Sequence, residues 1–317
     1  MKKALLVLLI LLLLVMTVPL VVPVPPLEGT VPPRELADPD SQFIELNGVD
    51  VHVKTSGAGE PVFVLLHGFG ASLYSWNAVM TSIAENGRVI AYDRTGFGLT
   101  ERPLNWVGEN PYSSEAQLQL LWALLDHFAM DKAILVGNSA GGTLGLQFSL
   151  AYPERVQGLV LVDPAVYSGG GAPTWLRPLL NTPQAKRLGP LFVRQFLAKG
   201  SSLLDSAWYD PTLISQETRD LYTKPLRAEN WDRALWEFTL ASQPTRLPER
   251  LGEIALPVLV ITGDNDRIVP AEQSVRLAGE LPQAELVVIP QAGHVPHEEK
   301  PDLFLNALEK FVYTINK

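Results

Sequence analysis

The first 27 residues differ from the rest of the chain in their hydrophobic pattern. Behind Lys2 and Lys3, residues 4–27 carry no charge, and residues 4–18 are nearly all Leu, Val and Ile. A helix of about 20 apolar residues is long enough to cross a bilayer. Because this stretch has no polar face, it predicts a transmembrane anchor or a signal segment at residues 1–27.

An uncleaved anchor suits this segment better than a secretory signal, because no Ala-x-Ala cleavage site follows the apolar run. The positive-inside rule keeps Lys2 and Lys3 in the cytoplasm and makes the rest of the chain extracytoplasmic. Secretion after signal cleavage is the alternative. Seven prolines lie between Pro19 and Pro39, so residues 28–41 are expected to form an extended Pro-rich linker.

From residue 42 to the end, apolar runs and helical periodicity alternate. The runs predict strands at 43–46, 49–55, 61–66, 88–92, 133–136, 157–162, 257–261 and 285–289. Apolar positions three and four residues apart predict helices at 73–85, 114–129, 143–152, 271–281 and 303–312. Asn47-Gly48 predicts a hairpin turn, and Ser114 with Gln117 predicts a capping box. This alternation indicates an α/β domain at 42–317, with about eight mostly parallel strands and helices on both faces.

One stretch interrupts the alternation. Residues 167–254 contain helical patches and four tryptophans but no convincing strand. We expect a helical cap inserted over the strand ends, in which Trp208 and Trp236 line an apolar substrate pocket. The alternative for each tryptophan is that it packs the small core of the insertion itself.

Composition and charge exclude several classes of function. The chain has 34 acidic and 25 basic residues, a net charge of -9, and no basic run, which argues against a nucleic-acid partner. It contains no cysteine. Disulfides, cysteine-ligated zinc and a thiol nucleophile are therefore excluded.

The pattern Gly137-Asn138-Ser139-Ala140-Gly141 lies between a predicted strand and a predicted helix. A strand that turns directly into a helix brings backbones close together, and glycines leave the room this needs. The turn exposes the serine hydroxyl above the strand ends. Ser139 is therefore the candidate nucleophile.

Two further candidates follow predicted strands, Asp266 and His294. Serine needs a base to take its proton, and histidine needs a carboxylate to orient its ring, so Ser139, His294 and Asp266 form a candidate triad. The competing bases and acids are less well placed: His52, His67, His127 and His297, and Asp163 and Asp264. The oxyanion would be held by the backbone N–H of Ala140 and that of Phe69, in the loop after the third strand.

In combination, the motifs resemble those of the α/β-hydrolase superfamily over roughly Gln42–Tyr313. The resemblance rests on His67-Gly68-Phe69-Gly70, Tyr92-Asp93-Arg94-Thr95-Gly96-Phe97-Gly98, Gly137-Asn138-Ser139-Ala140-Gly141-Gly142, Gly263-Asp264-Asn265-Asp266 and Gly293-His294. It implies an α/β-hydrolase fold with a helical cap, and it supports Asp266 over Asp264 because the family's acid lies three residues after the strand-end glycine.

The resemblance also narrows the reaction. Haloalkane dehalogenases and epoxide hydrolases carry Asp at the nucleophile position, so Ser139 argues against both. Carbon–carbon bond hydrolases often carry Trp after the catalytic His, where this chain has Val295. The first expectation is thus a serine hydrolase of small uncharged carboxylic esters, without metal or organic cofactor. The alternatives are a carbon–carbon bond hydrolase of diketone-like substrates, a cofactor-free haloperoxidase or perhydrolase, and a non-catalytic binding scaffold.

Overall fold

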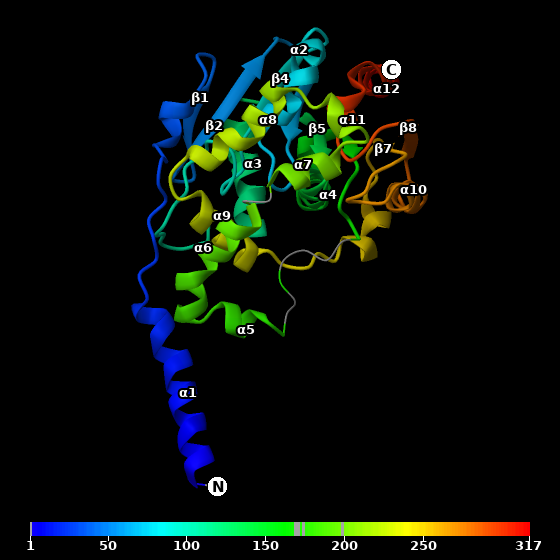
Figure 1. Ribbon diagram of the computed structural model, residues 1–317. Coiled ribbons are helices and arrows are strands. Elements are labelled where there is room, and N and C mark those ends of the chain that lie inside the picture. The colour runs from blue at the N-terminus through cyan, green and yellow to red at the C-terminus, as the bar shows by residue number, and fades with distance from the viewer. Residues whose placement is uncertain (1, 168–171, 173–174, 198–199) are drawn as a thin grey trace.

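A single sheet of eight strands organises the domain, in the order β1-β2-β4-β3-β5-β6-β7-β8. The computed structural model describes residues 2–317 except 168–171, 173–174 and 198–199 (Figure 1). The strands are β1 (Gln42–Leu46), β2 (Val49–Ser56), β3 (Val62–Leu66), β4 (Arg88–Tyr92), β5 (Ala133–Asn138), β6 (Val156–Val162), β7 (Val258–Gly263) and β8 (Ala284–Ile289). Only β1 and β2 pair antiparallel to their neighbours. The predicted α/β class and strand number are confirmed.

Helices cover both faces of this sheet, with α3, α4 and α10 on one face and α2 and α12 on the other. The helices of the described chain are α1 (Lys2–Val21), α2 (Asn77–Ala84), α3 (Ser114–His127), α4 (Ala140–Ala151), α5 (Arg177–Leu180), α6 (Pro183–Leu197), α7 (Gly200–Ala207), α8 (Gln216–Thr223), α9 (Trp231–Ala241), α10 (Ala271–Glu280), α11 (Pro296–Glu299) and α12 (Pro301–Ile315). Short 3₁₀ turns lie at Pro33–Leu36, Leu73–Trp76, Pro153–Arg155, Pro211–Leu213, Lys224–Arg227, Leu247–Glu249 and Leu251–Glu253.

The central strand β3 shows why the sequences of these strands are continuous apolar runs. Val62, Val64 and Leu66 belong to the core that includes residues of α3, α4 and α10. Phe63 and Leu65 belong to the other core, with residues of α2 and α12. Successive side chains of a strand point to opposite faces, so a strand covered on both sides is apolar throughout.

Two local predictions were wrong in detail. The helix expected over residues 73–85 begins as a 3₁₀ turn and becomes α-helical only at Asn77. The capping box expected at Ser114 does not form, because Ser113 is the N-cap: its hydroxyl accepts from the backbone N–H of Ala116 at 3.0 Å, and Ala116 has no polar side chain to bond back. Gln117 instead donates to the backbone carbonyl of Thr95.

The segment between β6 and β7 forms the helical insertion, α5 to α9, in the described residues. Its α6 packs against α9. The insertion also holds the loop after β8, because the backbone N–H of His294 donates to the carbonyl of Ala207 at 2.6 Å. Glu299 joins the two as well, accepting from the backbone N–H groups of Gly293 and Tyr209.

The N-terminal helix ends inside the segment predicted as residues 1–27, and part of the predicted linker is bound to the domain. α1 continues through Pro19 to Val21 and projects from the domain (Figure 1). The second half of the predicted linker is not a free tether. Val31 pairs with Ala228, Leu36 is buried, and Asp38 accepts from Lys54 and Lys224, so residues 31–41 are bound to the domain.

Candidate active site

Ser139 lies between β5 and α4 with φ 52° and ψ -117°, and it is the N-cap of α4. The crowding that requires glycine on either side of it is severe. A Cβ at Gly141 would lie 2.1 Å from the carbonyl oxygen of Leu66, and a Cβ at Gly137 would lie 2.6 Å from the backbone of Gly141. The backbone therefore holds Ser139 in the left-handed region, at the positive end of the α4 dipole.

The predicted acid and base are in direct contact. His294 Nδ1 donates to Asp266 Oδ2 at 2.6 Å, and both side chains are buried. Asp266 Oδ1 accepts from the backbone N–H groups of Ile268 and Val269 at 2.7 and 2.9 Å. Each carboxylate oxygen is thus occupied, which fixes the orientation of the carboxyl group and of the imidazole ring.

Asn138 connects this pair to the serine, and sequence reasoning did not identify its role. Its Nδ2 donates to the backbone carbonyl of His294 at 3.0 Å and to that of Val162 at 3.2 Å. One amide therefore joins the ends of β5 and β6 and the loop after β8, next to Ser139. The only sequence signal was its position inside the Gly-x-Ser-x-Gly pattern.

The competing histidines have other surroundings. His52 is buried and bonded to Asp93 and Ser41, while His127 is exposed on α3. His297 is buried with its ring 4.3 Å from that of Trp76, and burial lowers its pKa to about 3. His67 is buried too, and burial lowers its pKa to about 3, so its imidazole is neutral.

Neutral His67 supports the loop that was predicted to hold the oxyanion. Its Nδ1 donates to the carbonyl of Gly68 at 2.8 Å, and its Nε2 accepts from the backbone N–H of Arg94. Arg94 Nη2 also approaches the Gly68 carbonyl, at 3.4 Å. This loop lies close to the serine, since a Cβ at Gly68 would be 3.3 Å from Ser139 Cβ.

A second buried carboxyl group stands beside the histidine and its acid. Ligand atoms of Asp163, Asp266 and His294 all lie within 4.8 Å of one another. Asp163 Oδ1 accepts from Thr262 Oγ1 at 2.6 Å, whereas its Oδ2 has no hydrogen-bond partner among the described residues. Burial, and then the neighbouring Asp266 carboxylate, raise the pKa of Asp163 well above its usual range. A proton on Asp163 would allow this oxygen to donate to the neighbouring Asp266 carboxylate. Asp264, by contrast, is exposed.

A pocket of about 400 Å³ opens at the serine. Its lining combines aromatic, aliphatic and polar side chains from both the domain and the insertion: Phe69, Arg94, Tyr112, Ser114, Gln117, Ser139, Ala140, Thr143, Leu144, Gln147, Ala165, Phe238, Thr239, Ser242, Gln243 and Thr245. The rings of Phe69, Phe97 and Phe238 contact one another. The insertion thus forms one wall of the pocket.

The two tryptophans expected to line this pocket lie elsewhere among the described residues. Trp208 is buried against Leu204, Ile214 and Val295. Trp236 is buried where a Cβ at Gly189 would lie 2.1 Å from its ring, so it packs against α6. Phe238, two residues after Trp236 on α9, lines the pocket instead.

Arg94 is the charged group in the lining of this pocket. It is 3% exposed, its Nε has no hydrogen-bond partner among the described residues, and its guanidinium lies 5.1 Å from the Phe97 ring centroid. Burial lowers its pKa to about 10, so it stays charged at neutral pH.

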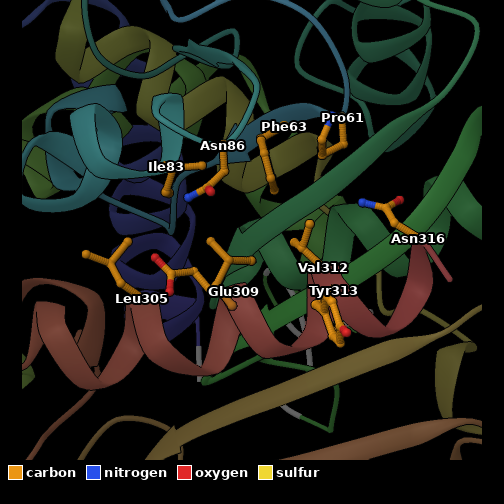
Figure 2. Close-up of a pocket in the computed structure, with 10 residues that line it drawn as sticks. Pro61, Phe63, Ile83, Asn86, Leu305, Glu309, Val312, Tyr313 and Asn316 are labelled. Carbon is orange, nitrogen blue, oxygen red and sulfur yellow. The ribbon is translucent and has the colours of Figure 1, made fainter.

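A cavity of about 380 Å³ lies at the opposite edge of the sheet. Figure 2 shows Leu305, Glu309 and Val312 of α12 facing Phe63 and Asn86 there. Its lining includes Pro61, just before β3 begins, whereas Ser139 follows the end of the parallel strand β5. Open parallel sheets bind ligands at the carboxyl ends of their strands, so this cavity is not the candidate site.

Comparison with known proteins agrees with this geometry. The family model for the alpha/beta hydrolase fold matches residues 61–301. The chain is 29% identical to the uncharacterized hydrolase YugF of Bacillus subtilis strain 168 over 281 residues, covering 88% of this chain and 99% of that protein. It is 32% identical over 269 residues to a 2-hydroxy-6-oxononadienedioate/2-hydroxy-6-oxononatrienedioate hydrolase of Paraburkholderia phymatum, covering 83% of this chain and 90% of that protein.

A solved structure shares the same fold. It is a thermophilic esterase from Thermogutta terrifontis, with a TM-score of 0.72 and 23% identity, covering 87% of this chain and all of that one (100%). The sheet order, the turn at Ser139 and the extent of the matched region lead to one conclusion: this chain belongs to the alpha/beta hydrolase family and is a hydrolase.

Proposed function

We propose that the protein cleaves carboxylic esters through an acyl-enzyme formed on Ser139. The observation that carries this proposal is the strained Ser139 turn beside a His294–Asp266 pair, with Asn138 bonded to the His294 backbone. In this mechanism His294 takes the hydroxyl proton as Ser139 attacks the carbonyl carbon, and then returns it to the leaving alcohol. Asp266 stabilises the imidazolium that forms. Water, activated by His294, then releases the acyl group.

The Gly68–Phe69 peptide is suited to stabilise the oxyanion. Its carbonyl accepts from His67 Nδ1 and is close to Arg94 Nη2. In a trans peptide the N–H points opposite to the carbonyl, so the Phe69 N–H is directed away from His67. Together with the Ala140 N–H at the start of α4, it would supply two donors where charge develops, a type of contact typically worth about 3–4 kcal/mol each in the transition state.

The lining of the pocket supports a small ester with an apolar acyl group. Phe69, Leu144 and Phe238 present apolar surface near Ser139, and the hydroxyl and amide side chains around them offer hydrogen bonds without charge. Each buried CH₂ of such an acyl group contributes about 0.8 kcal/mol to binding.

A second candidate is hydrolysis of a carbon–carbon bond in a substrate that carries a carboxylate. The observation that favours it is Arg94, whose buried guanidinium has a free Nε in the pocket lining. A carboxylate is the natural partner of such a group. The relative from Paraburkholderia phymatum is named for a substrate of this kind, a dienedioate.

We also propose that α1 anchors the enzyme in a membrane, with the catalytic domain outside the cytoplasm. α1 is a 20-residue helix, apolar after Lys2 and Lys3, whose side chains are not buried within the protein. Its length of about 30 Å matches the hydrocarbon core of a bilayer. Lys2 and Lys3 precede the apolar run, which favours a cytoplasmic N-terminus.

One assay separates the two candidate reactions. The full-length protein in detergent is given p-nitrophenyl esters of rising chain length and, in parallel, 2-hydroxy-6-oxononadienedioate. We expect higher kcat/KM on the esters, and the opposite order would select the carbon–carbon reaction.

Ser139→Ala should lower kcat by roughly 10⁴–10⁶-fold on the preferred substrate. Ser82→Ala, in α2, is the control and should keep full activity. A Ser139→Ala variant with near wild-type turnover would refute the triad.

A further inference from the structure

Charge is distributed unevenly along this acidic chain. The protein has 34 acidic residues, yet none of them lies between residues 164 and 204. The same segment contains five basic residues: Arg177, Lys186, Arg187, Arg194 and Lys199. α5 and α6 both belong to it. Arg194 forms an ion pair with Asp232 of α9 at 2.8 Å, whereas Lys186 and Arg187 form no ion pair among the described residues. The start of α6 is therefore locally cationic on a protein of net charge -9, and it is suited to an anionic surface.

Large apolar side chains are exposed on α5 and just before it. Trp175, just before α5, is 78% exposed, and Leu179 on α5 is 62% exposed. An isolated exposed leucine is ordinary. Tryptophan and leucine next to lysine and arginine are, however, the composition of a surface that lies in a membrane interface.

Hydrogen bonds between α6 and the N-terminal segment fix where these side chains lie along the length of α1. Gln184 Nε2 donates to the carbonyl of Met16 at 2.9 Å, Arg187 Nη2 to that of Val22 at 3.1 Å, and Arg194 Nη1 to that of Pro25 at 2.7 Å. From Gln184 to Arg194, the contacts of α6 thus pass from a residue inside α1 to residues beyond the end of α1.

The start of α6 therefore lies beside the last part of the apolar helix. Met16 is five residues before the end of α1 at Val21, which is about 8 Å at the α-helical rise. α5 precedes α6, and Figure 1 shows it on the side of the domain from which α1 projects. A bilayer that contains α1 would reach α5 and the first turn of α6.

We propose that the membrane-facing surface of the insertion, defined by Trp175, Leu179, Lys186 and Arg187, docks into the interface of the bilayer that holds α1, and that this bilayer contains anionic phospholipid. The apolar side chains enter the acyl boundary, and Lys186 and Arg187 remain among the headgroups. The inference rests on the proposed membrane anchor.

The docked surface adjoins the pocket at Ser139. Arg177 on α5 donates to the carbonyl of Ser242 at 2.7 Å and to the side chain of Gln243. Ser242 and Gln243 both line that pocket. One arginine thus joins the membrane-facing helix to a wall of the candidate active site, so substrate dissolved in the lipid would be close to the pocket.

The absence of cysteine allows a direct test with single-cysteine variants of the full-length chain. Leu179→Cys reports on the docking surface, and Leu12→Cys, within α1, reports separately on the anchor. Leu213→Cys is the matched control, because Leu213 is 65% exposed in the same insertion but lies in the turn between α7 and α8. Figure 1 shows both of these helices away from α1. Each thiol carries a nitrobenzoxadiazole label, and the protein is placed in nanodiscs of phosphatidylcholine and phosphatidylglycerol with doxyl-quencher lipids.

We expect strong quenching at positions 12 and 179 and at least threefold weaker quenching at position 213. Quenching at position 12 without quenching at 179 would overturn docking while the anchor stands. A label at position 12 that stays unquenched would overturn both proposals, and equal quenching at 179 and 213 would overturn the specific surface. Replacing phosphatidylglycerol by phosphatidylcholine should weaken quenching at 179 and leave position 12 unchanged. No change at 179 would refute the anionic lipid.

Discussion

Ser139 illustrates how much of the site depends on single residues. Its positive φ typically costs roughly 1–3 kcal/mol in a residue that carries a side chain. The neighbouring glycines make the turn sterically allowed, and Asn138 bonds two strand ends beside it. Strain that the surrounding structure maintains is frequent at catalytic positions, and here it holds the hydroxyl above the sheet.

The two buried aspartates should differ sharply on substitution. Asp266→Asn removes the charge that orients His294, and we expect kcat to fall by roughly 10³–10⁴-fold. Asp163→Asn replaces a protonated carboxyl group by an amide that can still donate to Asp266, so the loss should stay below about tenfold. Asp264→Asn, at an exposed position in the same loop as Asp266, is the control. The measurement is kcat of each variant on the preferred ester. A larger loss of kcat in Asp163→Asn than in Asp266→Asn would assign the acid of the triad to Asp163.

At the scale of elements, α9 divides its side chains between two tasks. Trp236 is buried against Gly189 of α6, whereas Phe238 lines the pocket and contacts Phe69 and Phe97. The same helix thus packs against α6 within the insertion and forms part of the wall of the pocket. This division explains why the tryptophan content of the insertion was a poor guide to the lining of the pocket.

Substitution on α9 should separate these tasks. Phe238→Ala should alter the preference for acyl chain length, because it enlarges the wall next to Ser139. Trp236→Ala should lower the melting temperature by several degrees, since a buried Trp→Ala change costs about 3–5 kcal/mol. Its losses in kcat/KM should be uniform across the ester panel. A change of chain-length preference in Trp236→Ala alone would restore the indole as a pocket wall.

At the scale of the whole molecule, buried acids make stability depend on pH. Burial raises the pKa of Glu298 to about 8, and the neighbouring Glu299 adds to the rise, although the hydroxyl of Tyr222 donates to Glu298. Asp163 also has a raised pKa through burial and the Asp266 carboxylate. The folded protein keeps these protons at pH values where the unfolded chain has released them.

Stability should therefore fall as the pH rises through this window. For Glu298 the window runs from its ordinary pKa of 4.5 to about 8, with a slope of about 1.4 kcal/mol per pH unit. Glu298→Gln removes this contribution, so its thermal unfolding should depend less on pH than that of the wild type, with Asp163 leaving a residual slope. The measurement is the melting temperature in detergent between pH 5 and 8. Equal pH dependence in the two proteins would show that Glu298 is ionised in the folded state.

The sequence by itself was enough to predict the sheet and to single out Ser139, Asp266 and His294 as candidates. Strands buried on both faces are apolar throughout, and only glycine allows a strand to turn so closely into a helix, so β3, β5 and Gly137–Gly141 were recognisable locally. Order along the chain then placed Asp266 and His294 after later strands, at the edge where parallel strands end.

Tertiary structure alone decided the surroundings of that site. Asp163 lies 103 residues before Asp266 along the chain, and no periodicity shows that their carboxyl groups meet. Arg94 and Phe238 come from a loop and from the insertion, and they share a pocket only because the insertion folds back over the sheet. The contacts of α6 with α1 are of the same kind, since Gln184 and Met16 are 168 residues apart. Local patterns record which side of an element is buried, whereas contacts between distant segments depend on how the chain packs.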